Sequence, residues 1–265
     1  MIFLKGGARQ RMNSKPIAVF DSGLGGISVL RRLIQVLPEE NFLYFGDSAN
    51  APYGPRPTEE IRSLTLENAD RLFSRGAKAL VVACNTATSA AIDTLRERYP
   101  NRIIIGIEPA LKLAVSRHPN GRILVMATDA TLREKKFATL MERFAEHCEI
   151  LKCPCPELVE FVERGELEGE ALQKILKAEL QAYLTPAPDA VVLGCTHFPF
   201  LRNAIQRVVG ETPELLDGAD GTAKETKRRL SEAGLLRTGS PGKVELVNSL
   251  QTPEIFALSE KLLSV

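Results

Sequence analysis

The sequence predicts an α/β fold in which mainly parallel sheets are covered by helices. Short apolar runs, typical of buried strands, alternate with segments whose apolar residues recur at helical spacing. Three of the runs in the first half of the chain also recur, in the same order and at a nearly constant offset, in the second half. This repeat predicts two similar halves, each built around its own sheet.

Each expected element follows from a local pattern. A helix is predicted over residues 58–76, where acidic residues open the segment and Gly76 ends it. Another helix is predicted to run from Pro199 to Gly210, because proline favours the first turn of a helix and glycine its end. The expected strands are the apolar runs at residues 16–20, 41–45, 79–83, 102–107, 122–127, 148–152, 190–194, 214–217 and 243–247.

Charge and hydropathy exclude two classes of partner. The net charge is +1, but the first fifteen residues hold four basic residues and no acidic one, so the remainder is slightly acidic. A nucleic-acid-binding protein normally presents a basic field, which this body lacks. No apolar run approaches the length of a membrane span, and residues 1–15 lack the apolar segment of a signal peptide. We therefore expect neither nucleic acid nor membrane as a partner, and residues 1–15 to form a disordered extension.

The cysteines indicate a reducing compartment. Five cysteines without an export signal favour free thiols, and hence a cytoplasmic protein. Cys153 and Cys155 form a C-x-C pair, but no second pair stands at the spacing of a zinc site. Buried thiols are therefore the favoured interpretation of this pair.

A glycine-rich turn follows the first strand in "FDSGLGG", from Phe20 to Gly26. Glycines permit close backbone approach, and the amides of a helix start can bind an anion. The acidic residue expected about twenty positions later in a dinucleotide-binding fold is misplaced here. A phosphate or carboxylate pocket is favoured over NAD, with a simple strand-to-helix turn as the alternative.

Two cysteines stand at equivalent positions of the two halves. Cys84 in "ACNTAT" and Cys195 in "GCTHFP" each follow a buried strand and precede a helix. A helix start favours a thiolate and so predicts a lowered pKa, whereas the alternative is an inert core cysteine. If the halves face each other, the two thiols approach a ligand from opposite sides. That arrangement suits the removal of a proton from one face of a carbon and its return to the other.

Polar neighbours accompany both thiols. His197 follows Cys195 by two positions and can orient or polarise it, as Asp21 can on the Cys84 side. In "GDSANAPYG", Tyr53 and Gly54 belong to a loop that could cover a small ligand or could be a plain surface connection.

These motifs together resemble the cofactor-independent aspartate/glutamate racemase family. The matching stretches are "FDSGLGGISVLR", "GDSANAPYG", "ACNTATSAA", "GIEPA" and "LGCTHFPFL". The resemblance implies two pseudo-symmetric α/β domains with the active site in the cleft between them. It places the first domain at residues 16–108 plus 217–265 and the second at 109–216. The implied reaction converts L- and D-glutamate without cofactor or metal, and supplies D-glutamate for peptidoglycan synthesis by a cytoplasmic homodimer.

The resemblance also implies roles for single residues. Cys84 and Cys195 would be the acid and base, assisted by Asp21 and His197, and Glu163 would support the Cys195 side, with Glu160 as its competitor. The residues implied to contact the substrate are Asp21, Ser22, Tyr53, Gly54, Asn85, Thr86, Thr128, Thr131, Thr196 and His197.

The sequence departs from the family pattern at several positions, and three other functions stay open. The departures are Glu134, Phe137, Gly218 and the stretch "VEFVE" at residues 159–163, and they bear on side-chain selectivity. One alternative is a racemase of another amino acid, such as aspartate. The others are a hydrolase with Cys195 as nucleophile and His197 as its base, and a non-catalytic amino-acid-binding module.

Overall fold

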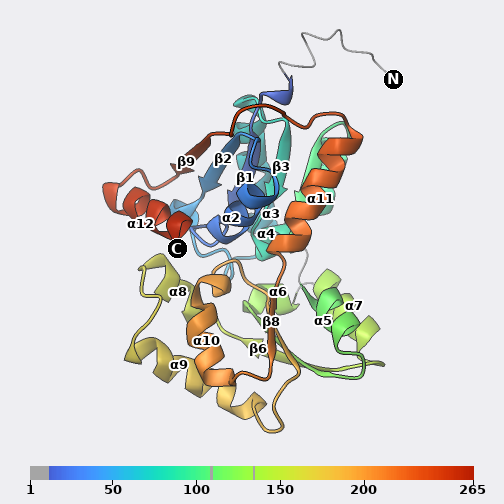
Figure 1. The fold of residues 1–265 in the computed structure, drawn as a ribbon, viewed down its shortest axis with the longest axis vertical. Helices are drawn as coiled ribbons and strands as arrows, with labels where there is room; N and C mark the ends of the chain where they lie inside the picture. Colours follow the sequence, from blue (N-terminus) through green and yellow to red (C-terminus); the bar gives the residue numbers. More distant parts are fainter. Residues whose placement is uncertain (1–11, 108–109, 134) are drawn as a thin grey trace.

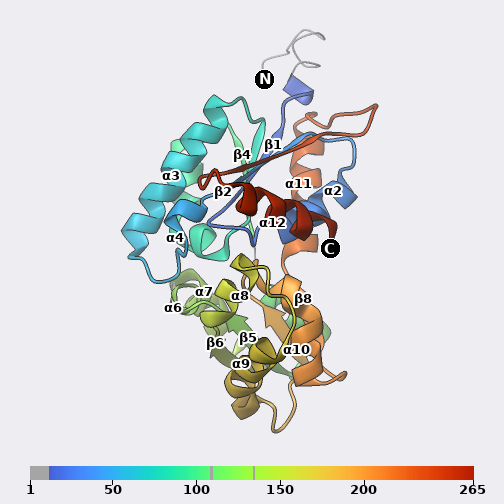
Figure 2. The ribbon, with the colours of Figure 1, turned by 90° about the vertical axis from the view of Figure 1, so that its left-hand side faces the viewer.

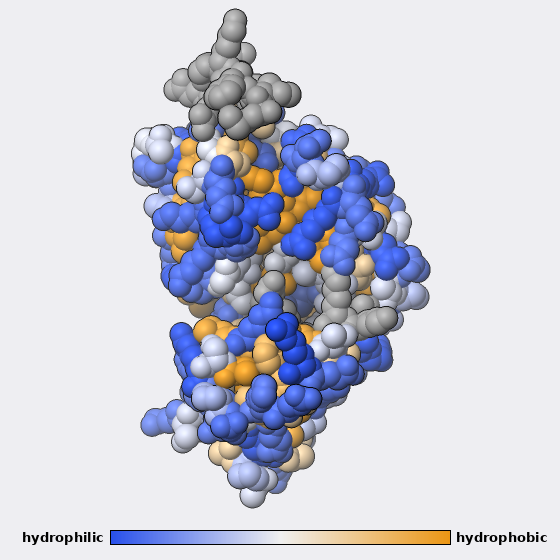
Figure 3. All heavy atoms as spheres, turned by 90° about the vertical axis from the view of Figure 1, so that its right-hand side faces the viewer, coloured by the Kyte–Doolittle hydropathy of each residue, from blue (hydrophilic) through white to orange (hydrophobic). Residues whose placement is uncertain are grey.

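The computed structural model describes residues 12–107, 110–133 and 135–265, which form two lobes joined at a narrower waist (Figures 1 and 3). Each lobe is built around one sheet in which every strand pairing is parallel. All the expected strands are present, and the predicted α/β class is confirmed. The strands are β1 (Ile17–Asp21), β2 (Phe42–Gly46), β3 (Ala79–Val82), β4 (Ile103–Gly106), β5 (Arg122–Ala127), β6 (Glu149–Pro154), β7 (Ala190–Leu193), β8 (Glu214–Asp217) and β9 (Val244–Asn248).

The two sheets repeat one topology. The first has the order β4-β3-β1-β2-β9 and the second the order β6-β5-β7-β8. The first half of the chain supplies β1 to β4, and the second half supplies β5 to β8. When the second sheet is read from its other edge, as β8-β7-β5-β6, both sheets place the fourth strand of their half first, followed by the third, the first and the second. Strand β9 extends the first sheet beyond β2. The expected similarity of the two halves is therefore confirmed in the strand order. It places the strands before Cys84 and Cys195 at equivalent positions.

The first sheet lies between two helical layers because alternate strand residues face opposite sides. Ile17 and Val19 of β1 share a core with Leu30, whereas Ala18 and Phe20 face the opposite core. Figure 2 shows α3 and α4 on one side of the strands and α2 and α11 on the other. The helices of this lobe are α2 (Ile27–Val36), α3 (Thr58–Ser74), α4 (Asn85–Arg98), α11 (Ala219–Glu232) and α12 (Pro253–Ser264), with the 3-10 turn η1 (Ser48–Asn50).

The second sheet is sandwiched in the same way. Leu124 and Met126 of β5 pack with Leu158 and Leu176 on one face, and Ile123 packs against α5 on the other. Its helices are α5 (Leu111–Arg117), α6 (Asp129–Arg133), α7 (Lys135–Phe144), α8 (Glu157–Glu163), α9 (Glu170–Leu180) and α10 (Arg202–Val209), with the 3-10 turns η2 (Gln181–Tyr183) and η3 (Phe198–Leu201).

One helix boundary differs from the prediction. The segment expected to be helical from Pro199 begins as the 3-10 turn η3 and becomes α-helical only at Arg202. The amides of Phe198 and Phe200 bond to carbonyls three residues earlier, on Cys195 and His197. This tighter turn brings the chain directly from the second cysteine motif into α10.

The start of the described chain is anchored to the first lobe. Residues 1–11 of the expected extension lie outside the described residues. Asn13 Nδ2 donates to the Leu236 carbonyl at 2.9 Å, and the Asn13 carbonyl accepts from Lys78 Nζ at 2.7 Å. The expectation of disorder is therefore wrong for Asn13. Within the described ranges, no helix combines the length and apolar character needed to cross a membrane.

Candidate active site

A cavity of about 400 Å³ lies where the carboxyl ends of the two sheets face each other. Ligands of open parallel sheets collect at this edge. The predicted site residues that line the cavity are Ser22, Tyr53, Gly54, Cys84, Asn85, Thr86, Thr128, Thr131, Glu163, Cys195, Thr196 and His197. Asp21 is fully buried behind this wall, and its carboxylate accepts a hydrogen bond from Thr196 Oγ1 at 3.1 Å. The two halves thus contribute their equivalent cysteines to one cavity.

Cys84 is the N-cap of α4. Its sulfur accepts from the Ala87 amide at 3.4 Å and lies 3.4 Å from Ser22 Oγ. Burial and then the nearby charge of Asp21 raise the pKa of Cys84 to about 12, and the bonds from Ser22 and the Ala87 amide only partly oppose them. The lowered pKa that the helix start predicts is therefore wrong for Cys84. Desolvation outweighs the helix amides, and the group rests as a neutral thiol.

Cys195 has different partners. Its Sγ lies 3.5 Å from His197 Nδ1, and His197 Nε2 lies 2.6 Å from Glu163 Oε1. Burial alone would lower the pKa of His197, but the bonds and charges of Cys195 and Glu163 raise it well above its usual range. Burial likewise opposes ionisation of Glu163, yet His197 and the Leu24 amide bring the pKa of that carboxyl below its ordinary value. A protonated imidazole thus stands between a sulfur and a carboxylate.

Glu160 is not part of this arrangement. Its carboxylate pairs with Arg164 at 3.3 Å, and its side chain is 73% exposed. Of the two acidic residues considered for the Cys195 side, only Glu163 contacts His197.

We expect Glu163→Gln to reduce turnover roughly 10- to 100-fold, because the carboxylate acts through the imidazole. Without that charge the raised pKa of His197 falls. In the variant, the imidazole loses its proton as the pH rises through this lowered pKa. In the wild type, the imidazole keeps its proton above pH 6.5, because its pKa is raised. The pH–rate profile between pH 5 and 9 is the measurement. Glu160→Gln is the matched control, and an equal change in both variants would contradict this role of Glu163.

The glycine-rich turn brings the two lobes together. A Cβ atom on Gly23 would lie 2.2 Å from Glu163 Oε1, and one on Gly25 would lie 2.5 Å from His197 Nδ1. The Leu24 amide donates to Glu163 Oε1 at 2.8 Å. The anion held by this turn is therefore a carboxylate of the protein itself. The glycines are required because the side chains of the other lobe occupy the space of a Cβ.

Hydroxyl groups from both lobes also meet at the wall of this cavity. Thr86 Oγ1 lies 3.2 Å from Thr128 Oγ1 and 3.3 Å from Thr131 Oγ1, and all three residues are buried. Nearby, Asn85 Oδ1 is buried and has no hydrogen-bond partner among the described residues. A buried acceptor of this kind is costly unless a ligand supplies a donor.

Several residues that hold this site together are not among the candidates predicted from the sequence. Ser28 Oγ donates to the Thr196 carbonyl at 2.8 Å, which fixes the second cysteine motif to α2. Asp47 and Asn68 bind Tyr53 behind the cavity wall. Ser28 and Asn68 lie inside helices where they look like ordinary polar positions. Asp47 adjoins the "PYG" loop, which is the one signal that could have singled it out.

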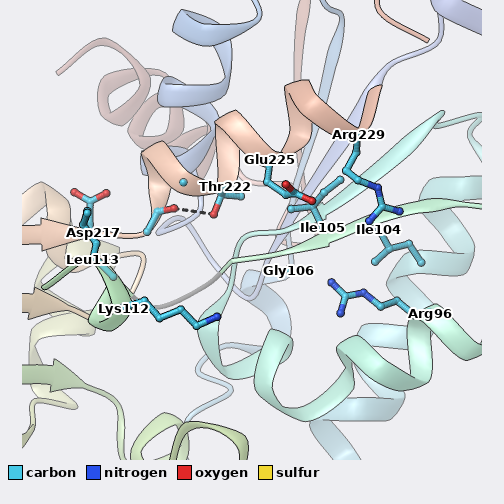
Figure 4. A pocket seen from close by; sticks show the side chains of 13 residues that line it. Arg96, Ile104, Ile105, Gly106, Lys112, Leu113, Asp217, Thr222, Glu225 and Arg229 are labelled. Carbon is cyan, nitrogen blue, oxygen red and sulfur yellow. Dashed lines mark hydrogen bonds between the residues drawn. The ribbon is translucent and has the colours of Figure 1, made fainter. Parts of the chain in front are cut away.

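A second cavity, of about 300 Å³, lies at the junction of the lobes, and neither Cys84 nor Cys195 lines it. Figure 4 shows Arg96, Lys112 and Arg229 around it, together with Glu225. Gly218, one of the departures from the family pattern, lies here at the start of α11. Two further departures, Glu134 and the side chain of Phe137, fall outside the described residues. Among the described residues, no three His, Cys, Asp or Glu side chains are placed to hold a metal ion.

Comparison with known proteins places the chain in a family. The profile of the Asp/Glu/Hydantoin racemase family matches residues 18–226. The glutamate racemase of Clostridium perfringens is 48% identical over 96% of this chain and 98% of its own length. A glutamate racemase isoform from Bacillus anthracis superposes with a TM-score of 0.87 at 30% identity, covering 96% of this chain and 95% of that one. The Francisella tularensis enzyme, solved with D-glutamate, gives 0.84 at 28% identity over 96% and 95% of the two chains. The chain therefore belongs to the Asp/Glu/hydantoin racemase family, and within it to the glutamate racemases.

Proposed function

We propose that this protein interconverts L- and D-glutamate with Cys84 and Cys195 as the two proton-transfer groups. The observation that carries the proposal is the placement of two thiols from equivalent strand ends on one cavity, with unequal partners. Cys84 rests as a thiol, whereas Cys195 contacts a protonated imidazole that can stabilise its thiolate. One group is therefore ready to give a proton and the other to take one.

The reaction follows from this difference between the two thiols. The Cys195 thiolate takes the α-proton from one face of the substrate, and the electron pair left on the α-carbon takes the Cys84 proton on the other face. After one turnover Cys195 is the thiol and Cys84 the thiolate, so the reverse reaction runs with the roles exchanged. His197 holds its proton toward the Cys195 sulfur throughout, and Glu163 keeps the imidazole charged.

The cavity suits an amino acid with two carboxylates. The hydroxyls of Thr86, Thr128 and Thr131 can turn their protons toward a carboxylate, and the unpartnered Asn85 Oδ1 can accept from an ammonium group. A related enzyme solved with D-glutamate supports glutamate over aspartate as the substrate. The product would supply D-glutamate for peptidoglycan synthesis in the cytoplasm.

We also propose the assembly that the family resemblance implies. The chain divides into domains of residues 16–108 plus 217–265 and 109–216, which the membership of the two sheets supports. The protein acts as a homodimer, and sedimentation equilibrium returning the mass of one protomer would refute this. Limited proteolysis that released no fragment ending between the two domains would speak against the boundaries.

A hydrolase is the second candidate, because Cys195, His197 and Glu163 form a linked series like that of a cysteine nucleophile and its base. Such an enzyme would not need Cys84. Its activity would survive Cys84→Ala, whereas racemisation would not.

The direct test is the exchange of the α-proton with solvent. L-glutamate and D-glutamate, incubated separately with the protein in deuterium oxide, should each lose the α-proton NMR signal while the opposite enantiomer appears. A binding module would leave the signal unchanged. Aspartate run in parallel identifies the substrate, since exchange of aspartate alone would overturn the assignment to glutamate.

A further inference from the structure

One wall of the active-site cavity is a loop that encloses a buried carboxylate. The loop connects β2 to α3, and its residues Ala51–Pro55 line the cavity. Asp47 begins the loop directly after β2 and is 1% exposed. Its amide donates to the Asp21 carbonyl at 3.0 Å, so its place is fixed beside the end of β1.

Three side chains donate hydrogen bonds to the Asp47 carboxylate. Tyr53 OH lies 2.7 Å and Asn68 Nδ2 3.0 Å from Oδ2, and Asn50 Nδ2 lies 3.1 Å from both oxygens. Asn50 and Tyr53 belong to the loop, whereas Asn68 belongs to α3. The carboxylate therefore ties the loop to itself and to the helix that follows. Hydrogen bonds to a buried charged group are among the stronger ones in proteins.

Tyr53 directs its hydroxyl away from the substrate. Burial, and then the bond and charge of Asp47, raise the pKa of Tyr53 far above its usual range, so the phenol stays neutral. Its one proton goes to Asp47, and its ring lies 6.4 Å from that of Phe20. The tyrosine offers the cavity an aromatic surface and no donor. Its contribution to binding is the shape it gives to the loop.

The loop reaches the other lobe through the next residue. A Cβ atom on Gly54 would lie 3.6 Å from Cβ of Thr128. Thr128 belongs to the hydroxyl cluster that also includes Thr86 and Thr131. A shift of the loop would therefore change the distance between the two walls that enclose a substrate.

We propose that Asp47, with Asn68 behind it, is a positioning residue that holds the Tyr53–Gly54 segment in the conformation that binds glutamate. The proposal rests on the function proposed above, because it concerns the same cavity. It adds two residues that do not touch the substrate.

Asp47→Asn is the first test. The amide keeps the size of the side chain, but it removes the charge and replaces one acceptor oxygen with a donor. Its remaining oxygen can still accept from Tyr53 and Asn68, through bonds that are no longer charge-assisted, whereas its NH₂ group faces the Asn50 donor. We expect KM for glutamate to rise about tenfold or more, while kcat changes less than about threefold, since neither thiol is touched. Tyr53→Phe deletes one donor and is expected to raise KM in the same direction, even where Asp47→Asn fails to fold. Because one variant weakens and the other removes the same Tyr53–Asp47 bond, the effects of the two substitutions on KM should be less than additive in the double variant.

Lys78→Met is the matched control for general destabilisation. Lys78 is as buried as Asp47 and lies at the opposite end of the same sheet, directly before β3. All variants are measured at a temperature at which each is folded by circular dichroism. The proposal is overturned if the two loop variants leave KM unchanged, if they lower kcat instead, or if Lys78→Met raises KM as much. Absence of exchange of the glutamate α-proton with solvent in the wild-type protein would instead refute the proposed function.

Discussion

Cys84→Ala is expected to lower racemisation about 10³- to 10⁴-fold, because it removes the group that protonates one face of the substrate. Solvent exchange should survive for only one enantiomer. Cys195 can still take the α-proton that faces it and return deuterium to the same face, which exchanges the proton without inverting the carbon. The measurement is the α-proton NMR signal in deuterium oxide, combined with chiral analysis of the product.

Cys195→Ala provides the complementary result. It should exchange the other enantiomer only, because the remaining thiol lies on the other face. Cys148→Ala is the matched control, since Cys148 is a buried cysteine on the opposite side of the second sheet and packs against α5 and α7. Two-base catalysis would be wrong if Cys84→Ala kept full racemisation, or if both site variants exchanged the same enantiomer. Retained hydrolysis of a test ester or amide in Cys84→Ala would favour the hydrolase.

Lys78→Met is expected to destabilise the fold by about 3–5 kcal/mol, the usual cost of breaking a buried ion pair from one side. Lys78 Nζ lies 2.5 Å from Glu40 Oε2, and both side chains are almost fully buried. It also donates to the carbonyls of Asn13 and Leu235. The variant leaves a buried carboxylate and two carbonyls without this donor. Urea unfolding followed by circular dichroism gives the free energy.

The double variant Lys78→Met/Glu40→Met distinguishes the contribution of the ion pair to the free energy of unfolding from that of the surrounding packing. Burial lowers the pKa of Lys78 even though Glu40 opposes the shift, which shows that desolvation of the ammonium group is only partly offset. Removing both charges should therefore cost less than removing Lys78 alone. A single variant within about 0.5 kcal/mol of the wild type would show that the pair adds nothing to stability.

Much of the fold follows from local patterns. Every strand coincides with a short apolar run of the sequence. Burial on both faces explains the runs of the central strands β1, β3 and β7, whereas the edge strands β6 and β9 are partly exposed. The repeated order of those runs predicted two similar halves, and the sheet orders confirm them. The helix expected over residues 58–76 spans Thr58–Ser74, and Gly76 follows it with φ +89°. Only the segment at Pro199 starts differently, because its bonds to carbonyls three residues back favour a 3-10 turn.

The electrostatics of the site could not be predicted in this way. A helix start next to Cys84 suggested a lowered pKa, but the actual shift depends on full burial and on Asp21, which is distant in sequence. The glycine-rich turn suggested an external anion, whereas its Leu24 amide holds Glu163, 139 positions away in the chain. The pKa of Cys84 and the group bound by the glycine-rich turn both depend on residues that are distant in sequence. Their burial and charge cannot be inferred from the neighbouring positions.

The sequence by itself determined the elements, their repeat, the family and the candidate residues, since strand and motif signals arise from neighbouring positions. The tertiary structure decided how those residues differ from one another. It made Cys84 a thiol beside a carboxylate and placed Cys195 against a charged imidazole. It also brought Asp47 and Lys78 into buried networks whose partners the local sequence does not specify. The physical reason is that burial and charge act through space, so two equivalent motifs acquire unequal chemistry only when the chain folds.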